Sequence, residues 1–348
     1  MASSQIQKVI YGTHELTQIE ELKKKFEGFA KIRTEAVVET QKVSLPIYSF
    51  QFGSSDPQAP AIAFVGGIHG LEIIGTQVIL SYLETFAELL HWDETLPALL
   101  NKVRLYFIPC ANPGGMLLRS RANPNGVDLM RNAPIQATGI SPFFLIGGHR
   151  ISPRIPWYRG EKSQEMELEN QALERFVRRE LFHGSFSLLL DLHSGFGNID
   201  RIWFPYAHTS KPYPRIAETM ALKKLLDRTY PHHVYALEPQ ALHYRAHGDF
   251  WDYMCLEQIK ATPTVPFIPL CLELGSWAWI RKNPRQLLSA LGVFNPVVPH
   301  RHARTLRRHL YLLNFLIQAS ASHKKWAVFS QEYRRSLELE AQTLWHSD

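Results

Sequence analysis

Short runs of apolar residues alternate with longer amphipathic segments along most of the chain. The runs have the length of buried β-strands, and the longer segments repeat apolar residues every three or four positions, as α-helices do. The predicted strands are residues 36–40, 45–52, 61–65, 103–109, 186–192, 202–206 and 269–274. The predicted helices are residues 14–30, 73–90, 165–181, 216–229, 249–258, 285–291, 304–319 and 331–344.

This alternation of strands and helices is typical of an α/β protein. Strands connected through helices pair in parallel, and the helices then cover both faces of the sheet. We therefore predict a three-layer α/β/α fold around a mixed, mostly parallel twisted sheet. No repeat or low-complexity linker divides the chain, so we predict one domain over residues 1–348. Within it, residues 1–32 contribute an N-terminal helix and residues 320–348 a C-terminal helical extension.

One long segment, residues 119–160, shows little periodicity and is rich in Pro, Gly, Asn and Arg. A loop of this length inside a compact domain is usually functional or disordered. Its many apolar and aromatic residues argue against disorder. The segment is therefore a candidate for part of a functional site.

The composition excludes several classes of protein. Of the 348 residues, 45% are hydrophobic and 20% charged, and the net charge of +6 is modest. The cations are spread along the chain, whereas nucleic-acid binding favours a dense basic face with interleaved aromatic residues. We expect no nucleic-acid partner and a mild preference for anionic substrates. The sequence leaves the oligomeric state open.

The cysteines and the N-terminus indicate a compartment. Cys110, Cys255 and Cys271 are odd in number and lie in apolar surroundings, which favours buried free thiols over disulfides. The N-terminus has no signal-peptide pattern, and no apolar run approaches about 18 residues. We therefore expect a cytoplasmic protein without a membrane partner.

The first candidate for chemistry is residues 66–72, which read Gly-Gly-Ile-His-Gly-Leu-Glu. This segment joins the predicted strand 61–65 to the predicted helix 73–90, so His69 and Glu72 lie where open α/β sheets place their sites. An imidazole and a carboxylate three positions apart can converge on one cation, and both suit zinc. Because the pair is common by chance, the prediction depends on finding its partners.

Two further residues supply such partners. His193 also ends a buried strand, and two histidines with one carboxylate form a catalytic zinc site that leaves a position for water. Asp191, two residues earlier, is either a strand-end cap or a residue that holds the local geometry. Glu273 is the one carboxylate in the apolar run 269–274. A buried glutamate is costly unless it is ion-paired or functional, so it is either half of an ion pair or a general base beside the metal.

In their order and separations these residues resemble the zinc metallocarboxypeptidase family, which includes the pancreatic carboxypeptidases, and more closely its compact bacterial members. The resemblance covers roughly residues 60 to 280. His69, Glu72 and His193 match the zinc signature, and Glu273 matches the catalytic glutamate. Four further segments also match family motifs: Asn-Pro-x-Gly at 112–115, Gly-Val-Asp-Leu-Met-Arg-Asn at 126–132, Glu-Leu-Glu at 167–169, and the spacing of Tyr244, Gly248 and Asp252.

The resemblance implies roles for three more residues. Arg131 matches the arginine that pairs with the terminal carboxylate of the substrate, a task that suits the planar guanidinium. Arg121 lies where compact relatives place an arginine that polarises the scissile carbonyl and holds its oxyanion, with Arg119 as the alternative. Tyr244 would close over bound substrate, unless it is only a surface aromatic residue.

The departure from the family is Met130, where an asparagine usually helps to grip the carboxylate. Methionine cannot donate a hydrogen bond, and losing one donor costs about 1 kcal/mol or more of binding. We expect side-chain selectivity to arise in residues 244–251. There Arg245 or His247 could favour an acidic group, and Trp251 could make the pocket apolar and roomy.

The resemblance implies a zinc hydrolase with one Zn²⁺ per chain that removes the C-terminal residue from a peptide, using metal-activated water and Glu273 as general base. One alternative is an N-acyl amino acid amidohydrolase, like the desuccinylase and aspartoacylase relatives, although these usually carry His-Gly-Asn-Glu where this chain has Leu71. The other is a catalytically silent protein that binds a peptide or carboxylate. Met130 is the only support for that alternative.

Overall fold

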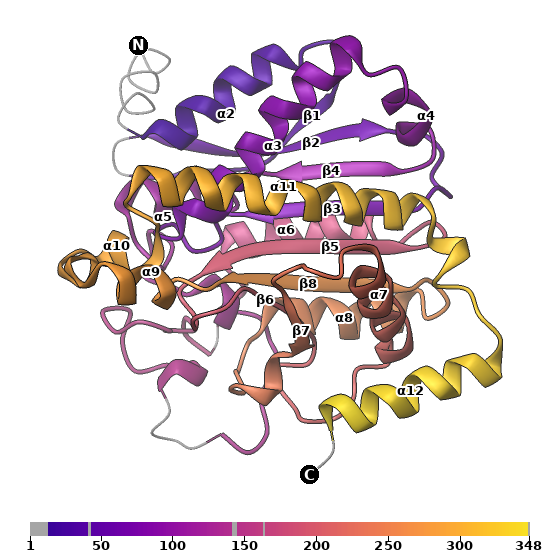
Figure 1. The fold of residues 1–348 in the computed structure, drawn as a ribbon. Coiled ribbons are helices and arrows are strands. Elements are labelled where there is room, and N and C mark those ends of the chain that lie inside the picture. The colour runs from indigo at the N-terminus through magenta and orange to yellow at the C-terminus, as the bar shows by residue number, and fades with distance from the viewer. Residues whose placement is uncertain (1–12, 41–42, 141–144, 163, 347–348) are drawn as a thin grey trace.

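The computed structural model describes residues 13–40, 43–140, 145–162 and 164–346, and its centre is an eight-stranded sheet (Figure 1). The order of the strands is β1-β2-β4-β3-β5-β8-β6-β7. Parallel pairs join β4, β3, β5 and β8 in the middle, and antiparallel pairs attach β2 and β6 on either side. The strands are β1 Lys31–Glu39, β2 Ser44–Gly53, β3 Ala61–Gly66, β4 Arg104–Ile108, β5 Ser187–Ser194, β6 Arg201–Phe204, β7 Ala236–Pro239 and β8 Phe267–Leu274.

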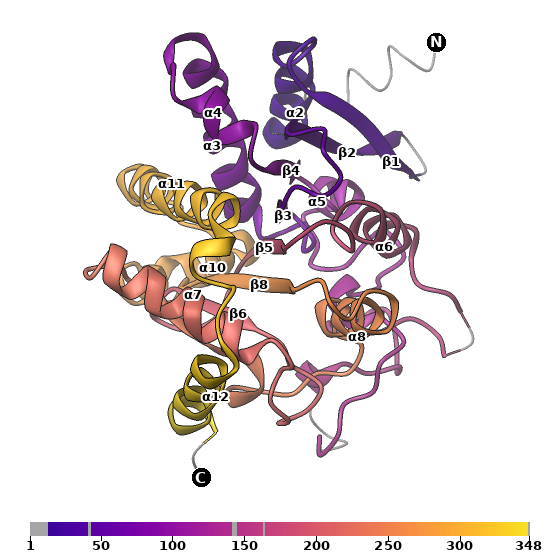
Figure 2. The same ribbon diagram turned by 90° about the vertical axis from the view of Figure 1, so that its right-hand side faces the viewer.

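Helices cover both faces of the sheet, which confirms the predicted three-layer fold. Viewed along its edge, the sheet has α3, α7 and α11 on one face and α6 and α8 on the other (Figure 2). The central strands β3 and β5 are buried along their whole length, as parallel strands between two helical layers are. The helices are α2 His14–Lys25, α3 Ile73–Trp92, α4 Leu96–Leu100, α5 Pro113–Leu118, α6 Leu168–Glu180, α7 Ile216–Thr229, α8 Phe250–Ala261, α9 Trp277–Lys282, α10 Ala290–Phe294, α11 Pro299–Ala321 and α12 Gln331–Trp345.

The apolar helix α3 belongs to the core. By length and composition alone, α3 could cross a membrane, although the sequence analysis predicted no membrane-spanning helix. However, 56% of its most apolar stretch is buried inside the fold, where it packs against β3 and β5. A core helix in a sheet protein has these properties.

Several predicted boundaries were wrong. α2 ends at Lys25 instead of continuing to residue 30, because the chain turns at Gly28 (φ +84°) to enter β1. The predicted helix 285–291 is divided at Ser289, whose extended backbone separates the 3₁₀ turn Pro284–Leu288 from α10. The short elements β7 and α9 were not predicted. Residues 1–12 of the predicted N-terminal segment and residues 347–348 lie outside the described residues.

The long segment 119–160 is irregular, as predicted. Its described part holds two 3₁₀ turns, Leu129–Arg131 and Leu145–Gly147, and an isolated bridge between His149 and Tyr158. Two other 3₁₀ turns, Gln240–Leu242 and His323–Lys325, lie elsewhere in the chain. The described part of residues 119–160 runs past the carboxyl ends of the central strands, where the candidate site lies.

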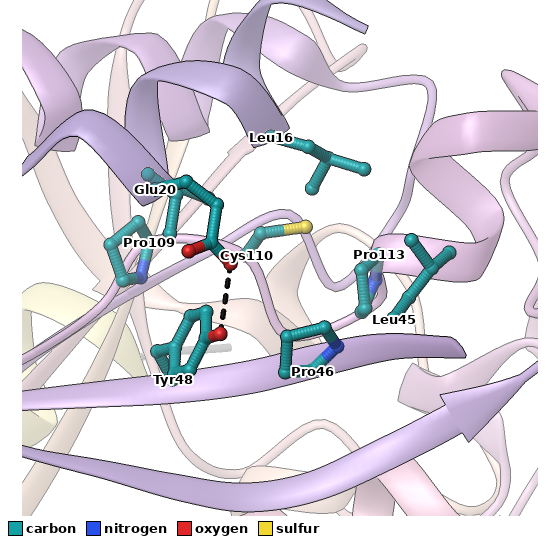
Figure 3. A pocket seen from close by; sticks show the side chains of 9 residues that line it. Leu16, Glu20, Leu45, Pro46, Tyr48, Pro109, Cys110 and Pro113 are labelled. Carbon is teal, nitrogen blue, oxygen red and sulfur yellow. Dashed lines mark hydrogen bonds between the residues drawn. The ribbon is translucent and has the colours of Figure 1, made fainter. Parts of the chain in front are cut away.

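The N-terminal helix α2 lies over β2 and encloses a small pocket (Figure 3). The Tyr48 hydroxyl donates to the Glu20 carboxylate over 2.8 Å, and the Lys23 ammonium donates to the same hydroxyl over 3.1 Å. Leucine and proline side chains form much of the remaining lining. The pocket is therefore part of the packing between helix and sheet.

The C-terminal helix α12 packs against α7 at the far edge of the sheet (Figure 1). The Trp345 indole N–H donates to the carbonyl of Leu237 in β7 over 3.2 Å, and an ion pair of 2.6 Å joins Arg334 to Glu218 of α7. Leu337 and Ala341 are buried beneath the helix. The extension thus completes the fold beside β6 and β7.

Candidate metal centre and active site

Three neighbouring strands end together and bring the predicted residues to one edge of the sheet. His69 and Glu72 follow β3 in the loop that leads into α3, whereas His193 and Glu273 lie near the ends of β5 and β8. β3, β5 and β8 are adjacent and parallel, and His193 and Glu273 are register partners. Open α/β sheets place their sites at this edge.

The loop that carries His69 is fixed against the start of α5. The Asn112 side chain caps α5 by accepting from the Gly115 N–H over 2.7 Å, and its amide donates to the carbonyl of Ile68 over 3.0 Å. A Cβ atom on Gly70 would lie 2.0 Å from the carbonyl carbon of Gly115. Glycine is needed for so close an approach of two backbones. The predicted turn is therefore a capped helix start that supports the loop.

His69, Glu72 and His193 converge on one point. Nδ1 of His69 lies 2.9 Å from Oε1 of Glu72, and Nδ1 of His193 lies 3.1 Å from Oε2. The two Nδ1 atoms are 3.2 Å apart. All three side chains are buried. Two imidazole nitrogens that face each other across a carboxylate are the donor set of a cation site.

The other nitrogen of each imidazole meets a buried carboxylate. Nε2 of His69 lies 3.2 Å from Oδ1 of Asp128, and Nε2 of His193 lies 2.6 Å from Oδ2 of Asp191. A proton on each Nε2 can be donated to these carboxylates, which would leave both Nδ1 lone pairs free to bind a cation together with Glu72. Carboxylates that orient ligand imidazoles in this way are characteristic of zinc sites.

The charge of the centre suits a divalent cation. Burial favours the neutral form of Glu72, but the charge of His69 and hydrogen bonds from both imidazoles hold the pKa of this carboxyl well below its usual range. The ligand atoms of His69, Glu72 and His193 all lie within 4.8 Å of one another. The donor set of two imidazoles and one carboxylate therefore fits zinc.

A second group of possible ligand atoms, from Asp191, His193 and Cys271, is also close together. Burial raises the pKa of the Cys271 thiol well above its usual value, so the thiolate that a metal requires is disfavoured. Asp191 is already bonded to Nε2 of His193. The centre formed with Glu72 is the better cation site.

Glu273 lies beside this centre without a fixed partner. Its Oε2 atom is buried and has no hydrogen-bond partner within the part of the chain that the structure describes. Burial raises the pKa of Glu273 to about 8; the charge of His193 opposes this shift and that of Glu72 adds to it. No ion pair to Glu273 forms among the described residues, so the alternative of a buried ion pair has no support. A carboxylate whose pKa is raised by burial is a stronger base than an exposed glutamate.

Arg121 reaches the centre, whereas Arg119 does not. The Arg121 guanidinium donates to Oε1 of Glu72 over 3.0 Å and to Oδ2 of Asp128 over 2.9 Å. Arg119 is exposed at the end of α5 with left-handed backbone (φ +50°). Of the two arginines considered for the oxyanion, Arg121 is the one that the fold positions.

Arg131 and Tyr244 lie together on the other side of the site. The Arg131 guanidinium is buried, donates to the carbonyls of Met130 and Ile146, and lies 3.4 Å from the Tyr244 hydroxyl. It forms no ion pair within 4.0 Å among the residues that the structure describes, although its charge acts on the nearby carboxyls of Asp128 and Asp249. The Met130 side chain is buried in the core, and its carbonyl accepts from Arg131 over 3.0 Å.

The Tyr244 ring is embedded among aromatic side chains. Its centroid lies 6.0 Å from that of Phe196 and 5.8 Å from that of Trp203. Burial raises the pKa of the Tyr244 phenol; the charge of Arg131 opposes this shift and that of Glu273 adds to it. Tyr244 therefore lies within electrostatic reach of both the anion-binding side and the base.

The structure does not place Trp251 where the sequence analysis expected it. The side chain is only 2% exposed, and its indole N–H donates to Oδ2 of Asp191 over 2.7 Å, behind the metal centre. It therefore does not line an open pocket. The prediction was wrong because an aromatic residue near Tyr244 in sequence points, in the first turn of α8, toward β5.

One functional residue was not singled out from the sequence. Asp128 joins His69 to Arg121 and is 1% exposed. Burial opposes its ionisation, but the charges of Arg121 and His69 hold the pKa of this carboxyl well below its usual range. The segment 126–132 carried the signal, since it matched a family motif, but only its Met and Arg were assigned roles.

Comparisons with known proteins agree with this geometry. A family model described as "Zinc carboxypeptidase" matches residues 35–275. The carboxypeptidase N catalytic chain of Rattus norvegicus is 27% identical over 158 residues, which are 41% of this chain and 33% of the relative. The match therefore covers about a third of the length of this relative.

Two solved structures have the same fold. Bovine thrombin-activatable fibrinolysis inhibitor is similar with a TM-score of 0.62 and 18% identity, over 90% of this chain and 96% of the other. Carboxypeptidase A from Helicoverpa armigera is similar with a TM-score of 0.60 and 16% identity, over 90% and 74%. The family match covers more than half of the chain and includes the residues of the metal centre, and so the chain belongs to the zinc carboxypeptidase family.

Proposed function

We propose that this protein is a zinc-dependent carboxypeptidase that hydrolyses the last peptide bond of its substrate, with one zinc ion per chain. Membership of the family supports this activity over the amidohydrolase and the silent binding protein. The observation that carries the proposal is the juxtaposition of two elements. A buried His69, Glu72 and His193 centre lies beside Glu273, a base whose Oε2 has no partner among the described residues.

The substrate would be held by its terminal carboxylate. Arg131 is buried and forms no ion pair among the described residues, and a guanidinium is able to contact a carboxylate at two points. Tyr244 would add a hydrogen bond from its hydroxyl. Because the Met130 side chain lies in the core, it contributes no donor, and Arg131 would carry most of the anion binding.

Hydrolysis requires proton transfer and charge stabilisation. Zinc held by His69, Glu72 and His193 would supply Lewis acidity that makes a water molecule a stronger nucleophile. Glu273 would take a proton from this water as its oxygen attacks the carbonyl carbon. The Arg121 guanidinium would donate to the carbonyl oxygen as its negative charge develops. Glu273 would then give the proton to the departing amine as the C–N bond breaks.

The test is direct. Purified protein should contain about one zinc per chain and should release single C-terminal amino acids from a panel of peptides, but not from peptides with an amidated C-terminus. His69→Ala should remove the metal. A folded wild type without zinc, or one that hydrolyses N-acyl amino acids but no peptide, would contradict the proposal.

We further propose that the protein functions in the reducing environment of the cytoplasm. Cys110, Cys255 and Cys271 are all buried and unpaired in the structure, which supports this location. Fractionation of cells that express the full chain is the test. Recovery of the protein outside the cytoplasmic fraction would contradict it.

A further inference from the structure

Three buried side chains form a series behind the metal centre. The indole N–H of Trp251 donates to Oδ2 of Asp191 over 2.7 Å, and the same oxygen lies 2.6 Å from Nε2 of His193. Their exposed fractions are 2%, 0% and 3%. Bulk water therefore does not compete for either hydrogen bond to Asp191.

The carboxylate in the middle of this series has few other constraints. Oδ1 of Asp191 is buried and has no hydrogen-bond partner among the described residues. Oδ2 receives both hydrogen bonds, so its two donors, Trp251 and His193, fix the orientation of the carboxylate plane. Without the indole donor, the carboxylate could rotate about its Cβ–Cγ bond with only the imidazole to oppose it.

Trp251 is well anchored for such a role because the first turn of α8 is rigidly held. Asp249 caps the helix by accepting from the N–H of Asp252 over 3.0 Å. Asp252 in turn accepts from the backbone N–H groups of Ala207 and His208, each over 2.7 Å. The indole position is thus fixed by the loop after β6 as well as by its own helix.

We propose that Trp251 is a positioning residue for zinc ligation, acting on His193 through Asp191. By holding Oδ2 of Asp191 against Nε2 of His193, the indole keeps the imidazole proton on Nε2 and the Nδ1 lone pair directed at the metal. Trp251 touches neither substrate nor metal. The inference rests on the proposed function, since it requires His193 to be a zinc ligand.

The test compares zinc affinity in the full-length protein. Trp251→Phe retains an aromatic ring and removes the N–H, and it should raise the zinc dissociation constant about tenfold, toward the effect expected for Asp191→Asn. It should also change the absorption spectrum of the Co²⁺-substituted protein, which reports ligand geometry. The double variant should bind zinc no more weakly than Asp191→Asn alone, because both substitutions disrupt one series.

Trp326→Phe is the matched control. Trp326 is also buried, and its indole donates to the Ala319 carbonyl over 2.8 Å, beside Phe186 at the opposite end of β5 from His193. This variant loses a buried donor of the same kind and should keep wild-type zinc affinity and Co²⁺ spectrum. A folded Trp251→Phe protein that matches this control in both measurements would overturn the inference.

A measurement on the wild type covers the case in which Trp251→Phe does not fold. The indole N–H resonance of Trp251 in ¹⁵N-labelled protein should shift when zinc is added, whereas that of Trp326 should not. An unmoved Trp251 resonance in a protein that binds zinc would overturn the inference and leave the proposed function intact. A wild type that binds no zinc would overturn both.

Discussion

The two histidines of the metal centre are held by carboxylates, but the two supports are built differently. On the His69 side, Asp128 offers one oxygen to the imidazole and the other to Arg121, a cation that also reaches Glu72. On the His193 side, a single oxygen of Asp191 meets both the imidazole and the neutral Trp251.

The difference assigns the two supports to different tasks. Arg121 has 20% of its side chain exposed, and in the proposed mechanism it meets the substrate carbonyl, so the His69 support would join metal binding to catalysis. The His193 support is buried throughout and faces the core. Substitutions of the carboxylate on the His69 side should therefore change both zinc affinity and kcat. Those on the His193 side should change zinc affinity alone.

The largest expected effect lies outside both supports. Glu273→Gln preserves shape but removes the base, so kcat should fall about 10³-fold while the zinc content stays at the wild-type level. Activity assays paired with metal analysis check this. An unchanged rate would mean that Glu273 has no part in proton transfer, and a loss of zinc would mean that it supports the metal as well.

Arg121→Gln should lower kcat about 10²- to 10³-fold, because the developing negative charge loses a preorganised donor. Arg119→Gln is the control, since Arg119 is exposed at the end of α5 and should tolerate the change. Steady-state kinetics at saturating zinc distinguish the two. Equal losses in both variants would reject the assignment to Arg121.

Asp128→Asn and Asp191→Asn compare the supports directly. Each should raise the zinc dissociation constant about 10- to 100-fold, because an imidazole loses its orienting carboxylate. At saturating zinc only Asp128→Asn should also lower kcat, since it releases Arg121. Chelator competition and kcat measurements check both statements. A similar loss of kcat in the two variants would remove the distinction between the supports.

The stability of the protein should depend on pH through Asp249, the buried cap of the helix that carries Trp251. Burial and the charge of Asp252 raise the pKa of Asp249, the cap of α8, to about 7. Since the folded state holds this proton more tightly than the unfolded chain, stability falls as pH rises from about 4 to about 7. The free energy of unfolding should be roughly 2–3 kcal/mol lower at pH 8 than at pH 5 from this group.

Asp249→Asn isolates that contribution, because asparagine can still cap the helix but cannot ionise. The variant should be more stable than the wild type at pH 8 and similar to it at pH 5. Denaturant unfolding at both pH values is the measurement. A variant that is destabilised equally at the two pH values would show that the carboxylate is needed in its charged form.

The parts of the fold that were predictable have strong local patterns. β3, β5 and β8 are apolar runs, and their parallel pairing explains why residues far apart in sequence meet at one edge. By contrast, the sequence of β7 (Ala-Leu-Glu-Pro) contains no apolar run, and the six residues of α9 are too few for a helical repeat. Such short elements are fixed by their neighbours in the fold and not by their own sequence.

The candidate site likewise has parts that could be predicted from the sequence and parts that could not. The metal-binding residues lie at or just after strand ends, and their order and spacing along the chain made the set recognisable together. The orientation of Trp251 depends on Asp191, 60 positions away in the chain, and no local pattern contains that information. Tertiary contacts between a helix and a neighbouring strand decided it, and only the structure could reveal them.

The C-terminal helix also bears on how the protein behaves at high concentration. β7 is the last strand of the sheet, and an uncovered edge strand offers main-chain groups to which another molecule can pair. Trp345 occupies one of these groups, the carbonyl of Leu237. We expect a chain that ends after Ala321 to aggregate at concentrations where the full chain stays monodisperse in light scattering. The extension would then serve as a guard against self-association, and equal scattering from both chains would argue against that role.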